Sequence, residues 1–481
     1  MRAKKKSETK SVLLVVPPET EVKDVKQTGS KWPRIGIAYL AGYLRKNGVS
    51  VSVLDCKAEG INHREVEERI ARASPGIVGV TSFTEEILSA AEVCNRAKKV
   101  RKDITTVIGG PHASAIPKQT LEEFQNIDVV VCGEGEQTIY ELASGKPLKE
   151  VKGIFFRKRG EISPTRPRAV IAGIDSIPMP AWDLFPLDRY RGILTERLRE
   201  ETASRELELP VLSARGCPFK CNFCYKVYGS TLRLRDPKKV VDEIEYDIEN
   251  YGATHFFFVE GTFGINKKWG VELCDEIIKR GLNKKISWVA ETRVDATEEL
   301  LKKMKEAGCK SIGFGVESGD PEILARSGKG ITLDMVRRTI GLAKKIGFAV
   351  ECYFIFGHPN ETRESIEKTI RLAEELDPDL FNVGIMIPYP GTGVRALAEQ
   401  GFGGYHLLCH DWSEYTKQRG GPLELKEIPI GELRKLQARA YMRFYMRPHR
   451  MIKILRTLPP SKIMKISLDL LKTSLGLGRN E

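Results

Sequence analysis

Three cysteines stand close together near the middle of the chain, in the segment Gly-Cys-Pro-Phe-Lys-Cys-Asn-Phe-Cys at residues 216–224. The thiolates of Cys217, Cys221 and Cys224 can converge on one metal centre, and sulfur ligands favour iron–sulfur clusters or zinc. A structural zinc site is closed by four protein ligands. A cubane cluster held by three cysteines leaves one iron open to another ligand, so the spacing favours a working cluster. The alternatives are a zinc site whose fourth ligand lies elsewhere and cysteines brought together by chance.

The other cysteines, of ten in all, lie singly in apolar segments, which predicts reduced and buried thiols rather than disulfides. Cys56, Cys94 and Cys132 are equally spaced and could hold a second cluster, but their neighbours favour two strand ends and a helix. His406, Cys409 and His410 have the residue types of metal ligands. Their spacing fits a packed helix or loop equally well.

The length and composition fit a globular protein of two or three domains, with 41% hydrophobic and 29% charged residues among 481. No apolar run reaches the roughly 18 residues of a transmembrane helix. The basic start at residues 1–6 precedes a strand-like segment rather than the apolar core of a signal peptide. We therefore expect a cytoplasmic protein.

The net charge of +13 is concentrated at the C-terminus. Residues 434–481 hold twelve Lys or Arg against two Asp or Glu, a net +10, which leaves +3 for the preceding 433 residues. A nucleic-acid partner would need a basic patch with interleaved aromatic residues, and the main body has none, so we expect no such partner. The helical basic region expected at 401–481 includes a helix at 429–446 and amphipathic segments after it. These can lie on an anionic membrane surface or cap the rest of the fold.

Strand and helix patterns alternate through the first 144 residues. Apolar runs predict strands at residues 11–16, 49–54, 76–81, 105–108 and 128–132, with helices at 35–45, 62–73, 85–101 and 118–124. This alternation predicts a doubly wound, Rossmann-like parallel sheet for residues 1–144. Ligands of such sheets bind at the carboxyl ends of the strands. Glycine-rich or hydroxyl-bearing loops follow three of these strands, at residues 82–84, 109–112 and 133–136.

The alternation resumes at residue 205, after a basic, proline-rich connector at 145–204 for which we expect irregular structure. Six strand–helix repeats follow up to residue 400, with strands at 210–214, 255–259, 286–290, 311–316, 349–356 and 380–387. They predict a partial (β/α)6 barrel, similar to a TIM barrel, with the active site at the carboxyl ends of the strands. Polar or glycine residues end these strands, among them Glu260, Glu317 and Glu361. Such carboxylates can bind a charged ligand or act as caps at the following helices.

The cysteine loop, with the aromatic Phe223 just before the last cysteine, resembles the signature of radical S-adenosylmethionine (radical SAM) enzymes. The resemblance implies that Cys217, Cys221 and Cys224 bind a 4Fe-4S cluster whose open iron is chelated by SAM. An external low-potential electron donor, of the ferredoxin or flavodoxin type, would supply an electron that cleaves SAM to methionine and a 5′-deoxyadenosyl radical. The implied SAM-binding residues are Phe223, Glu260, Gly261, Arg293, Glu317, Ser318 and Gly357.

The three loops of the first sheet, taken as an ordered set, resemble those of the cobalamin-binding domain that precedes many radical SAM domains. The motif Asp-x-His-x-x-Gly, which ligates cobalt in other cobalamin domains, is missing, and residues 17–21 are Pro-Pro-Glu-Thr-Glu instead. Many cobalamin-type radical SAM enzymes also lack this histidine, and some relatives keep the fold without the cofactor. His112 is the nearest alternative cobalt ligand, or an ordinary loop residue. The implied cobalamin-binding residues are Ser82, Thr84, Gly109, Gly110, Gly133 and Glu134.

The resemblance implies an enzyme that abstracts hydrogen from an unactivated carbon of a small-molecule or lipid substrate and transfers a methyl group to it from methylcobalamin. A second hypothesis is a cyclase or carbon–carbon cross-linking enzyme, acting on tetrapyrroles or lipids without methyl transfer. A third is a metal-binding nucleic-acid adaptor, which predicts zinc rather than iron and leaves the six barrel repeats unexplained. The basic C-terminal region adds a peripheral membrane contact to the expected cytoplasmic location.

Overall fold

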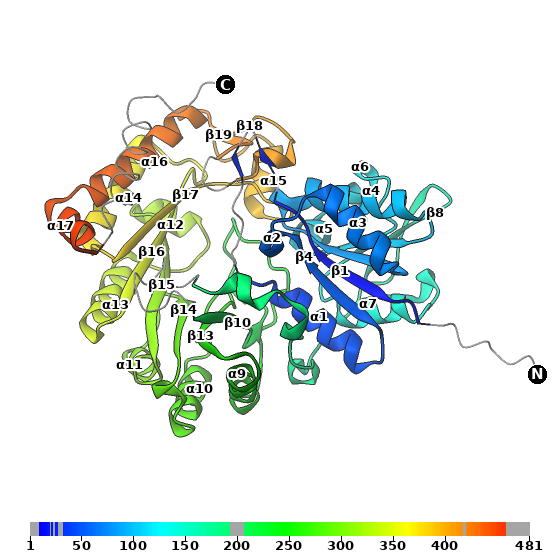
Figure 1. Cartoon of the computed structure of the whole chain (residues 1–481). Helices are drawn as coiled ribbons and strands as arrows, with labels where there is room; N and C mark the ends of the chain where they lie inside the picture. The colour runs from blue at the N-terminus through cyan, green and yellow to red at the C-terminus, as the bar shows by residue number, and fades with distance from the viewer. Residues whose placement is uncertain are drawn as a thin grey trace, which may run out of the picture.

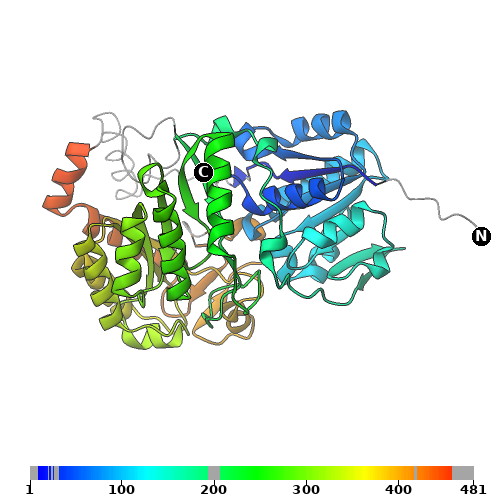
Figure 2. The same cartoon turned by 90° about the horizontal axis from the view of Figure 1, so that it is seen from below.

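The structure contains two large β-sheets that lie side by side, and helices pack on each of them (Figure 1). The structure is a computed structural model that describes residues 9–19, 21–22, 25–26, 32–192, 206–416 and 420–457. The orange segment that includes α15 (Gly393–Glu399) lies at the junction of the two parts, also when the molecule is seen from below (Figure 2).

The first sheet has the strand order β4-β1-β5-β6-β7-β8-β9, and its first five strands are parallel. The residues of β1 are all buried and alternate between two hydrophobic clusters, with Leu14 on one face and Leu13 on the other. Because both faces of the sheet are covered here, β1 is continuously apolar. The predicted doubly wound, Rossmann-like sheet is confirmed. The five parallel strands are β4 (Val51–Asp55), β1 (Val12–Val16), β5 (Ile77–Thr81), β6 (Thr105–Gly109) and β7 (Val129–Val131).

The helices of this part include three that the sequence analysis missed, namely α2, α5 and α7, each of eight residues or fewer. Segments this short show little helical periodicity. The longer helices carry recognisable starts, as at α3, where Asn62 and Glu65 form a capping box. A short hairpin of β2 (Glu21–Val22) and β3 (Val25–Lys26) follows β1. The helices are α1 (Ile35–Lys46), α2 (Cys56–Glu59), α3 (His63–Ala73), α4 (Ile87–Val100), α5 (Pro111–Ala115), α6 (Pro117–Glu123) and α7 (Glu136–Ala143).

The connector is more regular than expected. It contains β8 (Ile154–Lys158) and β9 (Glu161–Pro164), which extend the first sheet as an antiparallel hairpin paired with β7. The turn of the hairpin is formed by Arg159 and Gly160, which both have positive φ angles. The expectation of irregular structure throughout residues 145–204 was therefore wrong for this hairpin. The domain boundaries at residues 144, 204 and 400 stay predictions.

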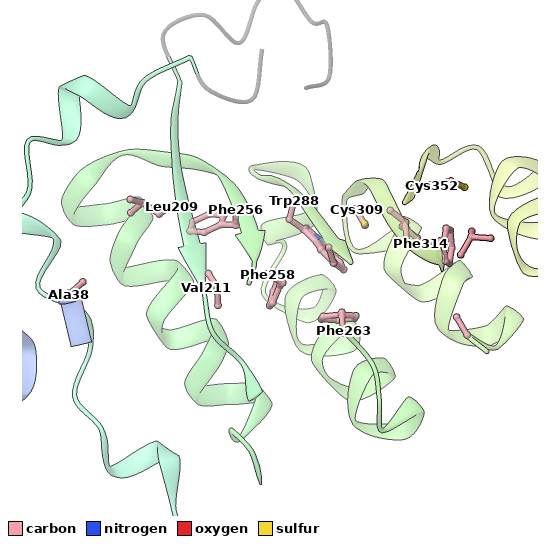
Figure 3. Packing of buried hydrophobic residues seen from close by; sticks show 14 of the residues in the cluster. Ala38, Leu209, Val211, Phe256, Phe258, Phe263, Trp288, Cys309, Phe314 and Cys352 are labelled. Atoms are coloured by element: carbon pink, nitrogen blue, oxygen red, sulfur yellow. The ribbon is translucent and has the colours of Figure 1, made fainter. Parts of the chain in front are cut away.

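The second sheet is parallel throughout, and its six strands are ordered as they occur in the chain, from β10 to β17. Aromatic side chains, among them Phe256, Phe258, Trp288 and Phe314, fill the space between this sheet and its helices (Figure 3). The partial barrel with six repeats is confirmed. Its strands are β10 (Leu207–Val211), β13 (Ala253–Phe258), β14 (Ser287–Thr292), β15 (Cys309–Glu317), β16 (Ala349–Phe356) and β17 (Leu380–Ile385). Its helices are α9 (Pro237–Tyr251), α10 (Lys267–Lys279), α11 (Glu298–Glu306), α12 (Pro321–Arg326), α13 (Leu333–Ile346), α14 (Arg363–Leu376) and α15.

The basic helix α16 (Ile430–Tyr445) covers the outer edge of the barrel at β17. The backbone N–H groups of Val383 and Phe381 donate to the hydroxyls of Tyr441 (3.1 Å) and Tyr445 (3.0 Å), and the Gln437 amide donates to the Val383 carbonyl (2.8 Å). Side chains of α16 thus provide hydrogen-bond partners for backbone groups on the free edge of the sheet. The sequence left two roles open for the basic region, contact with a membrane surface or capping of the fold. The helix α16 has the second role, because it covers the edge of the barrel. The segment 463–471 lies outside the described residues.

Among the described residues, the rest of the C-terminal region includes the hairpin of β18 (Tyr405–Leu407) and β19 (Leu423–Leu425), the short helix η8 (Trp412–Glu414) and α17 (Pro448–Thr457). Within the described ranges, none of the helices is both long and apolar enough to span a membrane.

Candidate functional site

The cysteine loop projects from a two-stranded hairpin formed by β11 (Ala214–Arg215) and β12 (Arg233–Leu234). Gly216 starts the loop with φ = +85°, and a Cβ atom there would lie 2.1 Å from the Thr231 carbonyl oxygen, so only glycine fits. The Cys217 N–H donates to the Gly229 carbonyl (3.1 Å) across the base of the loop. The hairpin therefore fixes the start and the end of the loop, with Cys217 at its base and Cys221 and Cys224 farther out.

The thiols of the loop are partly accessible, and Cys224 is the most exposed of the three. Burial raises the pKa of Cys221 and of Cys224, and the neighbouring cysteines raise the pKa of Cys224 further because thiolates repel one another. A bound cation, such as that of an iron–sulfur cluster, would stabilise the three thiolates of one loop against this repulsion. Across the described part of the chain, no group of three His, Cys, Asp or Glu side chains forms the shell of a single metal ion. Three sulfur donors in one open loop fit a cluster with one iron left free.

The other candidate metal ligands are engaged elsewhere. His406 lies 3.2 Å from Glu424, and the His410 Nδ1 atom lies 3.3 Å from an Arg395 nitrogen. These contacts favour the interpretation of this segment as a packed loop. Cys56 and Cys94 are buried in one hydrophobic cluster, as expected for structural thiols.

The segment after α12 holds the cysteine loop from one side. The Asn222 N–H donates to the Ser327 carbonyl (2.9 Å), and the Asn222 side-chain amide donates to the Arg326 carbonyl (3.1 Å). On the other side, the Val394 N–H of α15 donates to the Asn222 carbonyl (3.0 Å). The loop is thus fixed by the fourth and the sixth strand–helix repeats of the barrel.

Glu260 lies at the carboxyl end of β13 and is buried, with 7% of its surface exposed. Its carboxylate accepts hydrogen bonds from the hydroxyl and the backbone N–H of Ser213. Burial raises the pKa of Glu260 to about 7. A carboxyl group that changes its charge near neutral pH at the mouth of a barrel is a candidate ligand-binding group.

Glu317 ends β15 in a strained conformation with φ = +69° and forms a buried ion pair with Lys329. The Lys329 ammonium also donates to the Gly315 carbonyl (2.7 Å). The sequence analysis missed Lys329, although it stands between two glycines with positive φ angles, Gly328 and Gly330. Such a turn is a weak signal on its own, and the pairing with Glu317 becomes visible only in the fold.

Arg293 follows β14, and its guanidinium lies over the Phe219 ring of the cysteine loop, with the Cζ atom 3.6 Å from the ring centroid. It also donates to the Lys329 carbonyl (2.7 Å). Ser318 is fully buried, and its hydroxyl accepts a hydrogen bond from the Asp320 N–H (3.1 Å) at the start of α12. Arg293 is therefore placed beside the cysteine loop, whereas the hydroxyl of Ser318 is engaged in the turn.

The loop after β16 faces the same end of the barrel. Gly357 has φ = +92°, and its N–H and that of His358 donate to the Glu361 carboxylate, whose pKa burial raises to about 8. Glu361 therefore acts within its own loop. The buried His358 ring meets Phe223 edge to face, with centroids 5.9 Å apart, and burial lowers the pKa of His358 to about 4. Phe223 thus links the cysteine loop to this loop.

The predicted cobalamin loops of the first sheet come together at the carboxyl ends of β5, β6 and β7. The Ser82 hydroxyl donates to the Gly109 carbonyl (3.3 Å). Gly110 has φ = +106°, and a Cβ atom there would lie 2.6 Å from the Ser82 carbonyl oxygen. Around Gly133 a Cβ atom would meet nothing within 4 Å. The first two loops are therefore closely packed, and Gly133 borders open space. Thr84 is buried in η1 (Thr84–Glu86).

Glu134 has partners that the sequence analysis did not foresee. Its carboxylate accepts hydrogen bonds from Arg215 (3.2 Å), Arg233 (2.7 Å) and the Ile171 N–H (2.6 Å). These contacts join the β7 loop to the hairpin below the cysteines. The assignment of Glu134 to cobalamin stays a prediction.

His112 is buried, and within the described residues neither of its ring nitrogens has a hydrogen-bond partner. Burial lowers the pKa of His112 to about 3, which keeps the ring neutral. Trp412 of η8 meets it edge to face, with ring centroids 4.8 Å apart, and donates from its indole N–H to Glu123 (2.7 Å). Because η8 also packs against η1 and α4, this C-terminal segment lies over the predicted cobalamin loops. No sequence pattern indicated a role for Trp412.

Two family models match the chain. The model of the radical SAM superfamily matches residues 211–373, which include the cysteine loop, and the model of the B12 binding domain matches residues 23–143, which include the three loops of the first sheet. Both resemblances expected from the sequence are confirmed.

Similar proteins extend over nearly the whole chain. An uncharacterized methyltransferase of Pyrococcus horikoshii is 36% identical over 92% of this chain and 94% of its own length. An anaerobic magnesium-protoporphyrin IX monomethyl ester cyclase of Cereibacter sphaeroides is 32% identical over 88% of this chain and 68% of its own length. The radical S-adenosylmethionine methyltransferase TsrM of Kitasatospora setae, solved with cobalamin and a [4Fe-4S] cluster, has the same fold, with a TM-score of 0.69, 20% identity and coverage of 94% of this chain and 89% of that chain. The chain therefore belongs to the family of radical SAM enzymes that carry a B12-binding domain, and its cofactors are S-adenosylmethionine, a 4Fe-4S cluster and cobalamin.

Proposed function

We propose that the protein is a C-methyltransferase that abstracts hydrogen from an unactivated carbon and replaces it with a methyl group. When bound, the cluster supplies the electron that cleaves SAM, and methylcobalamin supplies the methyl group. The observation that carries the proposal is the position of the two cofactor loops. The β7 loop of the B12-binding domain contacts, through Glu134, the hairpin residue Arg215, which stands two residues before Cys217. A substrate between the two domains would meet both cofactors.

The residues around the cysteine loop receive roles in SAM binding under this proposal. Cys217, Cys221 and Cys224 hold three irons, and the buried carboxylate of Glu260 accepts a hydrogen bond from the SAM amino group. Glu317, held by Lys329, is positioned for the ribose hydroxyls. Arg293 would form an ion pair with the SAM carboxylate, because its guanidinium already lies over the Phe219 ring of the cysteine loop. Gly261, Ser318, Gly357 and Phe223 line the same site.

The loops after β5, β6 and β7 bind cobalamin under this proposal. Ser82, Thr84, Gly109 and Gly110 line the slot for its nucleotide tail, and the open space at Gly133 faces the rest of the cofactor. His112 offers two unpaired nitrogens to hydroxyl or phosphate groups of the tail, which would satisfy a buried polar group that otherwise lacks partners.

The first experiment is anaerobic purification from cobalamin-supplied cells, followed by measurement of iron and cobalamin per chain. We expect about four irons and one cobalamin. Cys221→Ala should lose iron and SAM cleavage, whereas the control Cys409→Ala should keep both, because Cys409 lies outside the loop. SAM cleavage that survives in Cys221→Ala, or zinc in place of iron, would contradict the assignment. Products one methyl group heavier than the substrate would then identify the reaction.

The second candidate function is ring formation without methyl transfer, and it is supported by the similarity to the cyclase of Cereibacter sphaeroides. Full cleavage of SAM by a chain that contains the cluster but no cobalamin would favour this candidate. A small-molecule substrate such as a tetrapyrrole, or a membrane lipid reached through the basic C-terminal region, remains compatible with either reaction. The electron donor that we propose is a ferredoxin or flavodoxin.

A further inference from the structure

Two glutamates and two arginines form a buried ionic quartet between the domains. The guanidinium of Arg215 lies 3.2 Å from Glu134 and 2.6 Å from Glu136, and that of Arg233 lies 2.7 Å from Glu134. The exposed fractions of the four side chains are between 3% and 6%. The two negative and two positive charges balance, so the quartet carries no net charge.

Each pair of the quartet belongs to a cofactor loop. Glu134 follows Gly133 in the loop after β7, and Glu136 is the first residue of α7. Arg215 and Arg233 are register partners in the hairpin from which the cysteine loop projects. The quartet is therefore a direct link from the cobalamin side to the cluster side.

The geometry of the quartet is fixed by further contacts. Arg233 also donates to the Tyr228 carbonyl (3.0 Å) at the end of the cysteine loop and to the Ile171 carbonyl (2.8 Å) of the connector. The Arg215 guanidinium lies over the Tyr228 ring, with its Cζ atom 5.0 Å from the centroid. Planar guanidinium groups with several directed donors tolerate little rotation or shift. The two loops can thus hardly move relative to each other without breaking several bonds.

Stability alone does not account for this arrangement. Buried ion pairs often contribute little more than well-packed apolar residues of the same size, because the charges lose their hydration. What a buried quartet adds is a defined position of one loop relative to the other. In a reaction that must bring groups from two cofactors together, a displacement of about 1 Å can cost about a hundredfold in rate.

We propose that Glu134, Glu136, Arg215 and Arg233 are positioning residues that hold the cobalamin loop and the cluster loop at one fixed separation. The inference rests on the proposed function in that both cofactors are bound at these loops. The quartet touches neither reacting atom and acts through the two loops that it joins.

The separation can be measured without a substrate. Cobalamin in the Co(II) state and the reduced cluster each carry an unpaired electron, and the cluster speeds up the relaxation of the cobalt spin in a way that depends steeply on distance. The experiment compares this relaxation in the holoenzyme, in Glu136→Gln and in Arg215→Lys. The matched control is Glu374→Gln, because Glu374 forms a bidentate ion pair with Arg443 (2.9 and 2.7 Å) between α14 and α16, at the outer edge of the barrel.

We expect both quartet variants to bind iron and cobalamin at wild-type ratios. The relaxation rate of the cobalt spin should nevertheless change several-fold and should vary more widely among the molecules of the sample. Glu374→Gln should behave as the wild type does. Unchanged relaxation in the quartet variants, or an equal change in Glu374→Gln, would overturn the inference. A wild-type chain that binds no cobalamin would instead refute the proposed function, and the inference with it. Arg215→Lys keeps the positive charge and changes only the geometry of the hydrogen bonds. If Glu136→Gln does not fold, the relaxation measured in Arg215→Lys therefore tests the inference by itself.

Discussion

The buried carboxyl group of Glu260 allows a quantitative test, because its pKa of about 7 lies well above the ordinary value of 4.5. The perturbation is Glu260→Gln, which keeps the size of the side chain and removes its titration. Between these two pH values the folded protein holds a proton on Glu260 that the unfolded chain has released. The free energy of unfolding therefore falls as the pH rises from about 4.5 to about 7, and above that it stays at the lower level.

The size of this effect follows from the gap between the two pKa values. At about 1.4 kcal/mol for each pH unit, the gap corresponds to about 3 kcal/mol. The glutamine side chain does not titrate, so the variant does not lose stability in this way as the pH rises. The difference in free energy of unfolding between Glu260→Gln and the wild type should therefore increase by about 3 kcal/mol, in favour of the variant, between pH 4.5 and pH 8. Effects of the substitution that do not depend on pH cancel in this comparison.

The assay is denaturant unfolding of the protein without cofactors at both pH values, with Glu299→Gln on the exposed face of α11 as the control. Anaerobic SAM binding gives a second measurement. If the carboxylate is the form that accepts the SAM amino group, the wild-type affinity should rise by roughly tenfold from pH 6 to pH 8, as the ionised fraction increases. Glu260→Gln should bind SAM more weakly and with less dependence on pH.

A stability difference between Glu260→Gln and the wild type that stays constant with pH would refute the reasoning about burial. A SAM affinity that is unaffected by Glu260→Gln would refute the binding role alone. The two results are independent, because the first concerns the protein without cofactors.

Three further outcomes are expected. Lys329→Ala leaves the Glu317 carboxylate buried without its cation, which should lower the free energy of unfolding by about 3–5 kcal/mol in a denaturant titration, and an unchanged midpoint would contradict the pairing. Trp412→Ala removes the ring that packs against His112, which we propose binds the nucleotide tail, so it should weaken binding of cobalamin several-fold. It should leave cobinamide, which lacks that tail, unaffected, whereas an equal loss for both would point to general damage. Deletion of residues 458–481 should abolish flotation with anionic liposomes, and flotation that persists would exclude this segment as the membrane contact.

Local sequence patterns predicted both sheets and the cysteine loop. The strands β1 and β7 are continuous apolar runs because both faces of the sheet are covered there, and Cys217, Cys221 and Cys224 lie within one turn-rich segment. Such features depend on residues that are near one another in the chain. The antiparallel strands β8 and β9 escaped prediction because proline and basic residues around them mask their short apolar alternation.

The parts of the site that were missed depend on contacts between distant residues. Glu134 was assigned to cobalamin from its place after a strand, but its ionic partner Arg215 lies 81 residues away. Lys329 pairs with Glu317 only because the loop after α12 folds back over the end of β15. No periodicity or motif marks such a pair, and the position of a titratable group at a strand end does not reveal whether a cofactor or another side chain will neutralise it.

The contact between Trp412 and the first domain has a consequence for the order of events during synthesis. The indole of Trp412 donates to Glu123, which leaves the ribosome 289 residues earlier. N-terminal domains generally fold while the rest of the chain is still being made. The B12-binding domain therefore has a period in which its cofactor loops are folded and not yet covered by η8. A cofactor with a long tail enters most readily in this period, and later entry requires the C-terminal segment to lift away. Cells that contain cobalamin during expression should thus yield a better-loaded enzyme than cobalamin added to the finished protein.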